Sequence, residues 1–138
     1  MGLAMARRFA REEMNVVLSD IDESKLEAAV SEIRADGGNV QGVVTDVSLE
    51  SDNIQLLDTS IDVFGTVDVV CLNAGVQGSI GRSWALSAED YKWTMGILLD
   101  GVIHGVRTFV PHLVDQDAGH VVITASIAGH IFPPFGAP

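Results

Sequence analysis

Four short runs of mostly β-branched residues constrain the fold of this chain more than any other feature. The runs cover residues 15–20, 39–46, 67–73 and 120–126, and they barely alternate between apolar and polar side chains. A strand with one solvated face alternates, whereas a strand covered on both faces is nearly continuous in its apolar residues. The runs therefore predict strands in the interior of a parallel sheet.

Helical patterns separate the four runs. Apolar residues recur at helical spacing after Asp22 until Gly37, and again over roughly 50–64, where Gly65 closes the segment. In the second segment the apolar side chains that share one face are Ile54, Leu57, Ile61 and Phe64. Such helices are the usual crossovers between parallel neighbours.

The longest helix is predicted to begin at Ser87, because Ser87 and Asp90 have the spacing of a capping box. It runs to about Leu113, and Pro111 is expected to bend or end it. Between Trp93 and Phe109 it carries more apolar residues than one core face requires. This excess makes the helix a candidate contact surface.

The order of strands and helices predicts one α/β domain over residues 1–138 with a doubly wound parallel sheet. The chain opens in a helical pattern at 1–13, with no strand in front of it. We therefore expect an incomplete sheet, in which the first βα unit lacks its strand.

Charge and cysteine content narrow the classes of partner. The chain carries 19 acidic and 8 basic residues, a formal net charge of −11, which argues against nucleic acid and anionic membranes. Its apolar runs are too short to span a bilayer. Cys71 is the only cysteine, so we expect no intramolecular disulfide and no metal site, with the cytoplasm as the default compartment.

The first pair of candidate ligand-binding residues is Gly2 and Asp20. Gly2 opens the first helix, and Asp20 ends the next strand eighteen positions later. In dinucleotide-binding units a glycine lets the pyrophosphate approach the helix, and an acid about twenty residues on binds the ribose. Only one glycine of that fingerprint is present, and an acid after a strand is also a common helix cap.

Two further candidates follow the carboxyl ends of predicted strands, where ligands of open α/β sheets bind. Asn73, Ala74 and Gly75 leave backbone and amide groups accessible to a ligand, although a simple turn uses the same residues. Ser126 can donate a hydrogen bond to a substrate oxygen, but an isolated serine needs a partner to move a proton.

In their order along the chain, G-L-A, V-V-L-S-D, V-V-T-D-V, L-N-A-G and I-T-A-S-I-A-G resemble the motifs of the short-chain dehydrogenase/reductase family. The spacing between these motifs resembles that of the family over essentially all of the chain. The resemblance implies a Rossmann-like fold and an NAD(P)-dependent oxidoreductase that transfers hydride between the nicotinamide and an alcohol or ketone. It also implies a homo-oligomer, because the long helix commonly lies at a subunit interface in the family.

The resemblance assigns roles to the candidate residues. Ser126 would be the catalytic serine, and the cofactor would be held by Gly2, Asp20, Asp46, Val47, Asn73, Ala74 and Gly75. NAD is expected in preference to NADP, because the carboxylate of Asp20 would repel a 2′-phosphate and Ile21 supplies no positive charge.

The chain departs from the family at several positions. The catalytic tyrosine of a Tyr-x-x-x-Lys motif is expected about thirteen residues after Ser126, but Pro138 lies only twelve after it. Tyr91, the one tyrosine, fits no such role. We therefore expect the chain to be an inactive fragment, truncated at both ends, with the C-terminal part and the family's central first strand missing. That strand would lie between 15–20 and 67–73.

Two substitutions also differ from the family. Leu98 occupies the position of an asparagine that supports a proton relay. Glu13 occupies the position of a glycine that closes the first helix in the family. If the backbone is left-handed there, the replacement of glycine by glutamate would lower stability by about 1 kcal/mol.

These departures leave alternatives open. The chain could be a non-catalytic nucleotide-binding module, or an oligomerisation module that uses the long helix. The loop at 132–135 suggests an apolar wall for a substrate, although loop packing explains it equally well.

Overall fold

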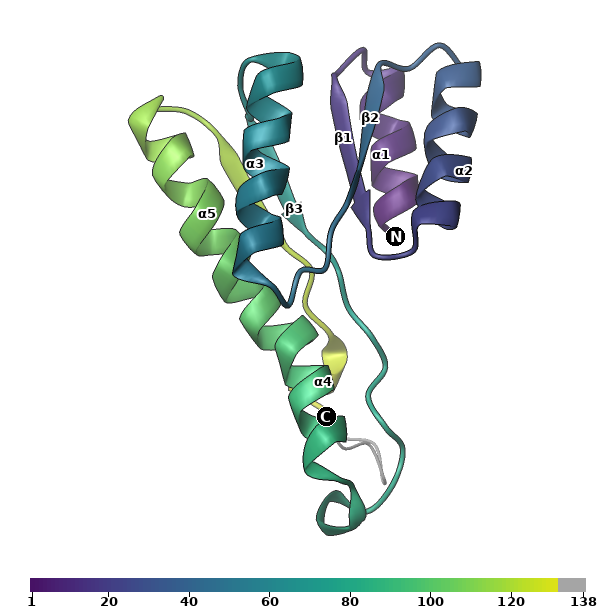
Figure 1. Cartoon of the computed structure of the whole chain (residues 1–138), viewed down its shortest axis with the longest axis vertical. Helices are drawn as coiled ribbons and strands as arrows, with labels where there is room; N and C mark the ends of the chain where they lie inside the picture. Colours follow the sequence, from purple (N-terminus) through teal and green to yellow (C-terminus); the bar gives the residue numbers. More distant parts are fainter. Residues whose placement is uncertain (132–138) are drawn as a thin grey trace.

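The computed structural model describes residues 1–131, so the apolar loop at 132–135 lies outside the described residues. The order of elements is α1 (Gly2–Arg11), β1 (Val16–Asp20), α2 (Glu23–Ala35), β2 (Val40–Val44), α3 (Glu50–Phe64), β3 (Val69–Leu72), η1 (Ser83–Ala85), α4 (Ala88–Met95), η2 (Gly96–Asp100), α5 (Gly101–Asp115), β4 (His120–Ile123) and η3 (Ile127–Gly129) (Figure 1). All four predicted strands are present with shorter bounds, and the predicted α/β class is confirmed.

The strands form two separate parallel pairs. β1 pairs with β2 from Val16↔Val40 to Asp20↔Val44, and β3 pairs with β4 from Val69↔His120 to Leu72↔Ile123. In the described part of the chain no ladder joins β1 to β3. The sheet is therefore interrupted between these two strands, where the sequence predicts a missing strand.

Each strand pair has its own hydrophobic core. Helices α1 and α2 pack on β1 and β2, while α5 packs on β3 and β4 and α3 packs on α5 (Figure 1). The first core contains Ala6, Val16, Leu26, Val30, Ile33 and Val40, and the second contains Val70, Phe109 and Leu113. The two cores lie on opposite sides of the interruption.

Helix α3 packs Leu57 of its predicted apolar face against the second core and buries two polar side chains beside that face. Asn53 and Ser60 are buried, whereas Ile54 is about half exposed. The amide of Asn53 donates to the carbonyls of Val47 and Leu49, and the Ser60 hydroxyl donates to the carbonyl of Leu56 at 2.6 Å. These bonds satisfy the two polar side chains inside the protein, which makes their burial possible.

The long helix begins at the predicted capping box and ends at Asp115, two residues after the predicted Leu113. The capping box of Ser87 and Asp90 is present with both of its hydrogen bonds. A π-helical turn, Gly96–Asp100, joins α4 to α5, and α5 continues through Pro111 to Asp115. Pro111 therefore does not end the helix, which is anchored on both sides of the proline by buried Phe109 and Leu113.

The continuous helix Ala88–Asp115 is long and apolar enough to cross a membrane by length and composition alone. Core helices meet the same criterion, and this one packs against α3, β3 and β4.

Helix α1 ends in a left-handed residue. Glu13 has φ 62°, and the N–H of Met14 reaches back to the carbonyl of Phe9 at 3.1 Å. The backbone at Glu13 is therefore left-handed, which is the condition under which a side chain there was expected to cost free energy. A side chain here costs free energy because its Cβ crowds the backbone.

We expect the substitution Glu13→Gly to raise the free energy of unfolding by about 1 kcal/mol, because glycine adopts this conformation without strain. Glu12→Gly is the matched control: Glu12 has φ −86° and is paired with Arg8, so glycine there adds chain entropy, removes the ion pair and lowers stability. Urea denaturation followed by circular dichroism measures both changes. A loss of stability in Glu13→Gly would contradict the strain argument.

Asp90 also fixes the loop that precedes α4. One carboxylate oxygen accepts the Ser79 hydroxyl at 2.6 Å, and the other accepts the N–H and hydroxyl of Ser87. The Tyr91 hydroxyl donates to the carbonyl of Ser83 in the same loop at 2.9 Å. The hydrogen bond from Ser79, followed by those from Ser87, lowers the pKa of Asp90.

A lowered pKa in the folded state means that this stabilisation is present above the unfolded pKa and is lost as the pH falls through the folded pKa. We expect an NMR titration to place the Asp90 midpoint below the ordinary value of 3.8. Ser79→Ala should move the midpoint upward. Ser51→Ala, whose hydroxyl donates to Asp52, is the control and should leave the Asp90 midpoint in place.

Candidate functional site

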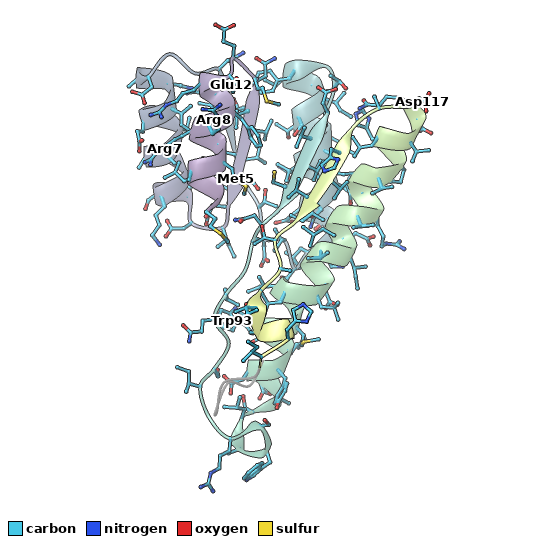
Figure 2. All side chains as sticks on the ribbon, turned by 180° about the vertical axis from the view of Figure 1, so that it is seen from behind. Met5, Arg7, Arg8, Glu12, Trp93 and Asp117 are labelled. Atoms are coloured by element: carbon cyan, nitrogen blue, oxygen red, sulfur yellow. The ribbon has the colours of Figure 1, made fainter. Side chains whose placement is uncertain are left out.

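A groove of about 950 Å³ lies between the two strand pairs. Its walls come from β1 and residues 67–76, with side chains of α1 and α3 covering its faces. Met5 of α1 lies at the groove, whereas Arg7 and Arg8 point away from it (Figure 2). The seven residues that the family resemblance assigns to the cofactor all line this groove: Gly2, Asp20, Asp46, Val47, Asn73, Ala74 and Gly75.

The amino-terminal end of α1 meets the carboxyl end of β3. A Cβ added to Gly2 would lie 3.0 Å from Nδ2 of Asn73, so a side chain at this position would crowd the Asn73 amide. Within residues 1–131 the N–H groups of Gly2 and Leu3 carry no hydrogen bond. Free N–H groups and the positive end of the helix dipole suit an anion, and a dinucleotide pyrophosphate fits this end.

Asp20 ends β1 with an exposed carboxylate. Its Oδ1 accepts the N–H of Asp22 at 3.0 Å, which fixes the side chain at the groove. Ile21, the next residue, is 65% exposed. The second carboxylate oxygen of Asp20 carries no hydrogen bond within the described residues, so it can accept one from a ligand hydroxyl.

Lys25 is a groove residue that the sequence analysis missed. Its Nζ lies 2.6 Å from Oδ2 of Asp22, and this contact raises the pKa of Lys25 and lowers the pKa of Asp22. Asp22 also caps α2 by accepting the N–H of Lys25. The capping pattern at Asp22 was visible in the sequence, and an i,i+3 acid and lysine pair could have indicated the ion pair.

Asp46 and Val47 are held by the start of α3 and by α5. Oδ1 of Asp46 accepts the N–H and hydroxyl of Ser48, at 2.9 and 2.7 Å. The carbonyl of Val47 accepts the Asn53 amide at 3.0 Å, and a Cβ on Gly101 would lie 2.9 Å from the Val47 side chain. Both residues therefore have fixed positions at the edge of the groove.

Ser126 follows the carboxyl end of β4 but lies outside the lining of the groove. It is exposed, and its Oγ accepts the N–H of Ala128 at 3.1 Å, which leaves the hydroxyl proton available to donate. Thr124, two residues earlier, donates to Oδ1 of Asn73 at 3.1 Å and ties the ends of β3 and β4 together. The alternation of strand residues puts Thr124 and Ser126 on the same side, a signal that could have identified Thr124.

The structure also places Leu98 and Tyr91, the two residues that bear on the proton relay and the catalytic tyrosine. Leu98 lies in the π-helical turn, and its Cδ2 would be 3.3 Å from a Cβ on Gly75. The hydroxyl of Tyr91 is engaged with Ser83. Among residues 1–131 no cluster of three or more His, Cys, Asp and Glu side chains is arranged to hold a metal ion.

The family model described as short chain dehydrogenase matches residues 1–138. An uncharacterized oxidoreductase of Listeria monocytogenes is 33% identical over 136 residues, which cover 99% of this chain and 54% of the relative. The 1-deoxy-11-beta-hydroxypentalenate dehydrogenase of Streptomyces avermitilis is 34% identical over 94% of this chain and 49% of the relative. The chain thus spans about half the length of these relatives.

Solved structures show the same fold. A short-chain dehydrogenase/reductase from Burkholderia phymatum in complex with NAD superposes with a TM-score of 0.93 and 41% identity, over 98% of this chain and 49% of that one. NAD⁺-bound xylitol dehydrogenase superposes with a TM-score of 0.92 and 31% identity, over 98% and 52%. The parallel strands, the residues gathered at their carboxyl ends and the match over the whole sequence agree: the chain belongs to the short-chain dehydrogenase family.

Proposed function

We propose that the chain is part of an NAD-dependent oxidoreductase that transfers hydride between the nicotinamide and an alcohol or ketone. The observation that carries the proposal is the shared groove. Gly2 at the α1 terminus, Asp20 at the end of β1 and Asn73 at the end of β3 line one cavity. Such a position outside the carboxyl ends of strands is where open α/β sheets bind nucleotides.

The charges around Asp20 support NAD over NADP. A free Asp20 oxygen can accept hydrogen bonds from ribose hydroxyls, while the carboxylate repels a 2′-phosphate. Lys25 is the nearby cation, and its ammonium is already bound to Asp22. Two of the structural neighbours are described as bound to NAD or NAD⁺.

In this proposal the nicotinamide supplies the hydride and the residues of the chain position both reactants. The N–H groups of Gly2 and Leu3 bind the pyrophosphate, and Asp20 binds the adenosine ribose. Asp46 and Val47 border the adenine, while residues 73–75 support the nicotinamide half. Ser126 donates its hydroxyl proton as a hydrogen bond to the substrate oxygen and holds that oxygen for reduction.

Proton transfer at the substrate oxygen needs a group other than Ser126. Tyr91, the one tyrosine of the chain, has its hydroxyl hydrogen-bonded to Ser83. The hydrocarbon side chain of Leu98 has no group that could pass a proton toward the substrate oxygen. A non-catalytic nucleotide-binding module is the second candidate, and Leu98 beside Gly75 is the observation that favours it.

We also propose that the intact protein forms a homo-oligomer through the long helix. Several of its apolar side chains are substantially exposed: Trp93, Met95, Leu98, Leu99 and Ile103. Packing two copies of this helix together would bury apolar surface that the isolated chain leaves in water.

The first experiment joins residues 1–138 to the flanking segments of the Burkholderia phymatum relative. We expect this chimera to oxidise or reduce alcohol and ketone substrates with NAD(H), and Ser126→Ala to lower its kcat by about 100-fold or more. Ser83→Ala, in the exposed loop, is the control and should retain activity. Micromolar binding of NADH by a folded chimera without any turnover would favour the non-catalytic module instead.

The second experiment measures cofactor choice in the same chimera by nicotinamide fluorescence. We expect Asp20→Asn to weaken NADH binding and to reduce the preference for NADH over NADPH by about tenfold, because the substitution removes the repulsive charge. Asp36→Asn removes an equal charge at the far end of α2 and should leave the preference unchanged. Equal effects of the two substitutions would show that general charge, not Asp20, sets the preference.

A further inference from the structure

Two helices meet at the backbone of Val47, a residue that lines the groove. The ring nitrogen Nδ1 of His104, in α5, lies 3.3 Å from the Val47 carbonyl oxygen, although the two residues are 57 positions apart. A carbonyl oxygen can only accept a hydrogen bond, so Nδ1 carries a proton and donates it. The Asn53 amide, from α3, donates to the same oxygen at 3.0 Å. The two bonds use both lone pairs of this carbonyl and fix its orientation.

Helix α5 also packs closely against the Val47 side chain. Gly101 lies one turn before His104, on the same face of the helix. A Cβ at Gly101 would lie 2.9 Å from Cγ2 of Val47, so glycine permits this approach without displacing Val47. Gly101 lines the groove together with Val47 and Asn53, but His104 is not among the described residues that line it. His104 can therefore influence a ligand of the groove only through the residues that it contacts.

A second histidine of α5 makes a comparable bond at the other end of the strands. The N–H of Val67 donates to Nε2 of His112 at 3.3 Å. Both rings are half-buried, and each binds a backbone group of another segment. Val67 precedes β3, whereas Val47 follows β2. Of these two bonds, only the one from His104 therefore lies at the carboxyl ends of the strands, where the candidate cofactor residues are gathered.

We propose that His104 is a positioning residue for the adenine half of the cofactor. From outside the groove it holds the Val47 carbonyl, and it thereby keeps the Val47 side chain in place as a surface for the adenine. The inference rests on the proposed function, because it takes the adenine to lie beside Asp46 and Val47. Without this bond the segment after β2 would be less ordered before the cofactor binds, and ordering it on binding would weaken the affinity.

Two substitutions at His104 separate hydrogen bonding from packing. His104→Leu keeps a branched side chain on α5 but has no donor for the Val47 carbonyl. His104→Asn keeps a donor, because the asparagine amide nitrogen is separated from the backbone by the same number of bonds as Nδ1 of histidine. His112→Leu is the matched control, since it removes the comparable bond to Val67. It should lower stability without changing cofactor affinity.

The first measurement needs no cofactor and uses the full chain, labelled with ¹⁵N. The amides of Ser48 and Leu49 donate to Asp46 at 2.9 and 3.0 Å, so their hydrogen exchange reports the order of this segment. We expect His104→Leu to speed exchange at both amides by about fivefold. His104→Asn and His112→Leu should leave it nearly unchanged. Unchanged exchange in His104→Leu would overturn the proposal.

The second measurement uses the chimera described above and compares NADH, ADP and reduced nicotinamide mononucleotide, which lacks the adenosine. We expect His104→Leu to weaken binding of NADH and ADP by about fivefold and to leave the mononucleotide unchanged. In turnover, the KM for NADH should rise while kcat stays constant. His104→Asn should bind NADH within about twofold of the parent chimera.

The ligands also separate a role in positioning from a general structural effect. Equal weakening of all three ligands in His104→Leu would indicate a disturbed fold, and unchanged NADH affinity would show that Val47 needs no such support. Either result would overturn this inference and leave the proposed function standing. A parent chimera that binds no NADH would overturn both.

Discussion

Backbone hydrogen bonding between parallel strands is the constraint on which the rest of this structure depends. Each strand can satisfy two neighbours, but β1 pairs only with β2 and β3 only with β4 among the described residues. Two small cores result, each formed by one strand pair and its helices. The groove is the space between the two strand pairs.

The candidate site depends on the same parallel arrangement. Because parallel strands end at the same edge of a sheet, Asp20, Asn73 and Thr124 come from distant parts of the sequence to one end of the molecule. The hydrogen bond from Thr124 to Asn73 links two of these ends directly. Helix α1 adds its amino terminus at Gly2, so one end of the sheet gathers backbone donors, a carboxylate and an amide.

The sequence predicts features that depend on local chemistry. Continuous β-branched runs identify the strands, and the capping box of Ser87 and Asp90 follows from hydrogen-bonding rules. The burial of Asn53 and Ser60 in α3 was not predicted, because these side chains find partners that a hydrophobic pattern does not show. The π-helical turn and the contact of Thr124 with Asn73 depend on tertiary packing. Hydrophobic spacing alone does not encode them.

The candidate cofactor residues belong to different strand pairs. Asp20 ends β1, which pairs with β2, and Asn73 follows β3, which pairs with β4. A cofactor that contacts both residues would therefore link the two strand pairs, and the distance between the Asp20 carboxylate and the Asn73 amide depends on how these pairs are held relative to one another.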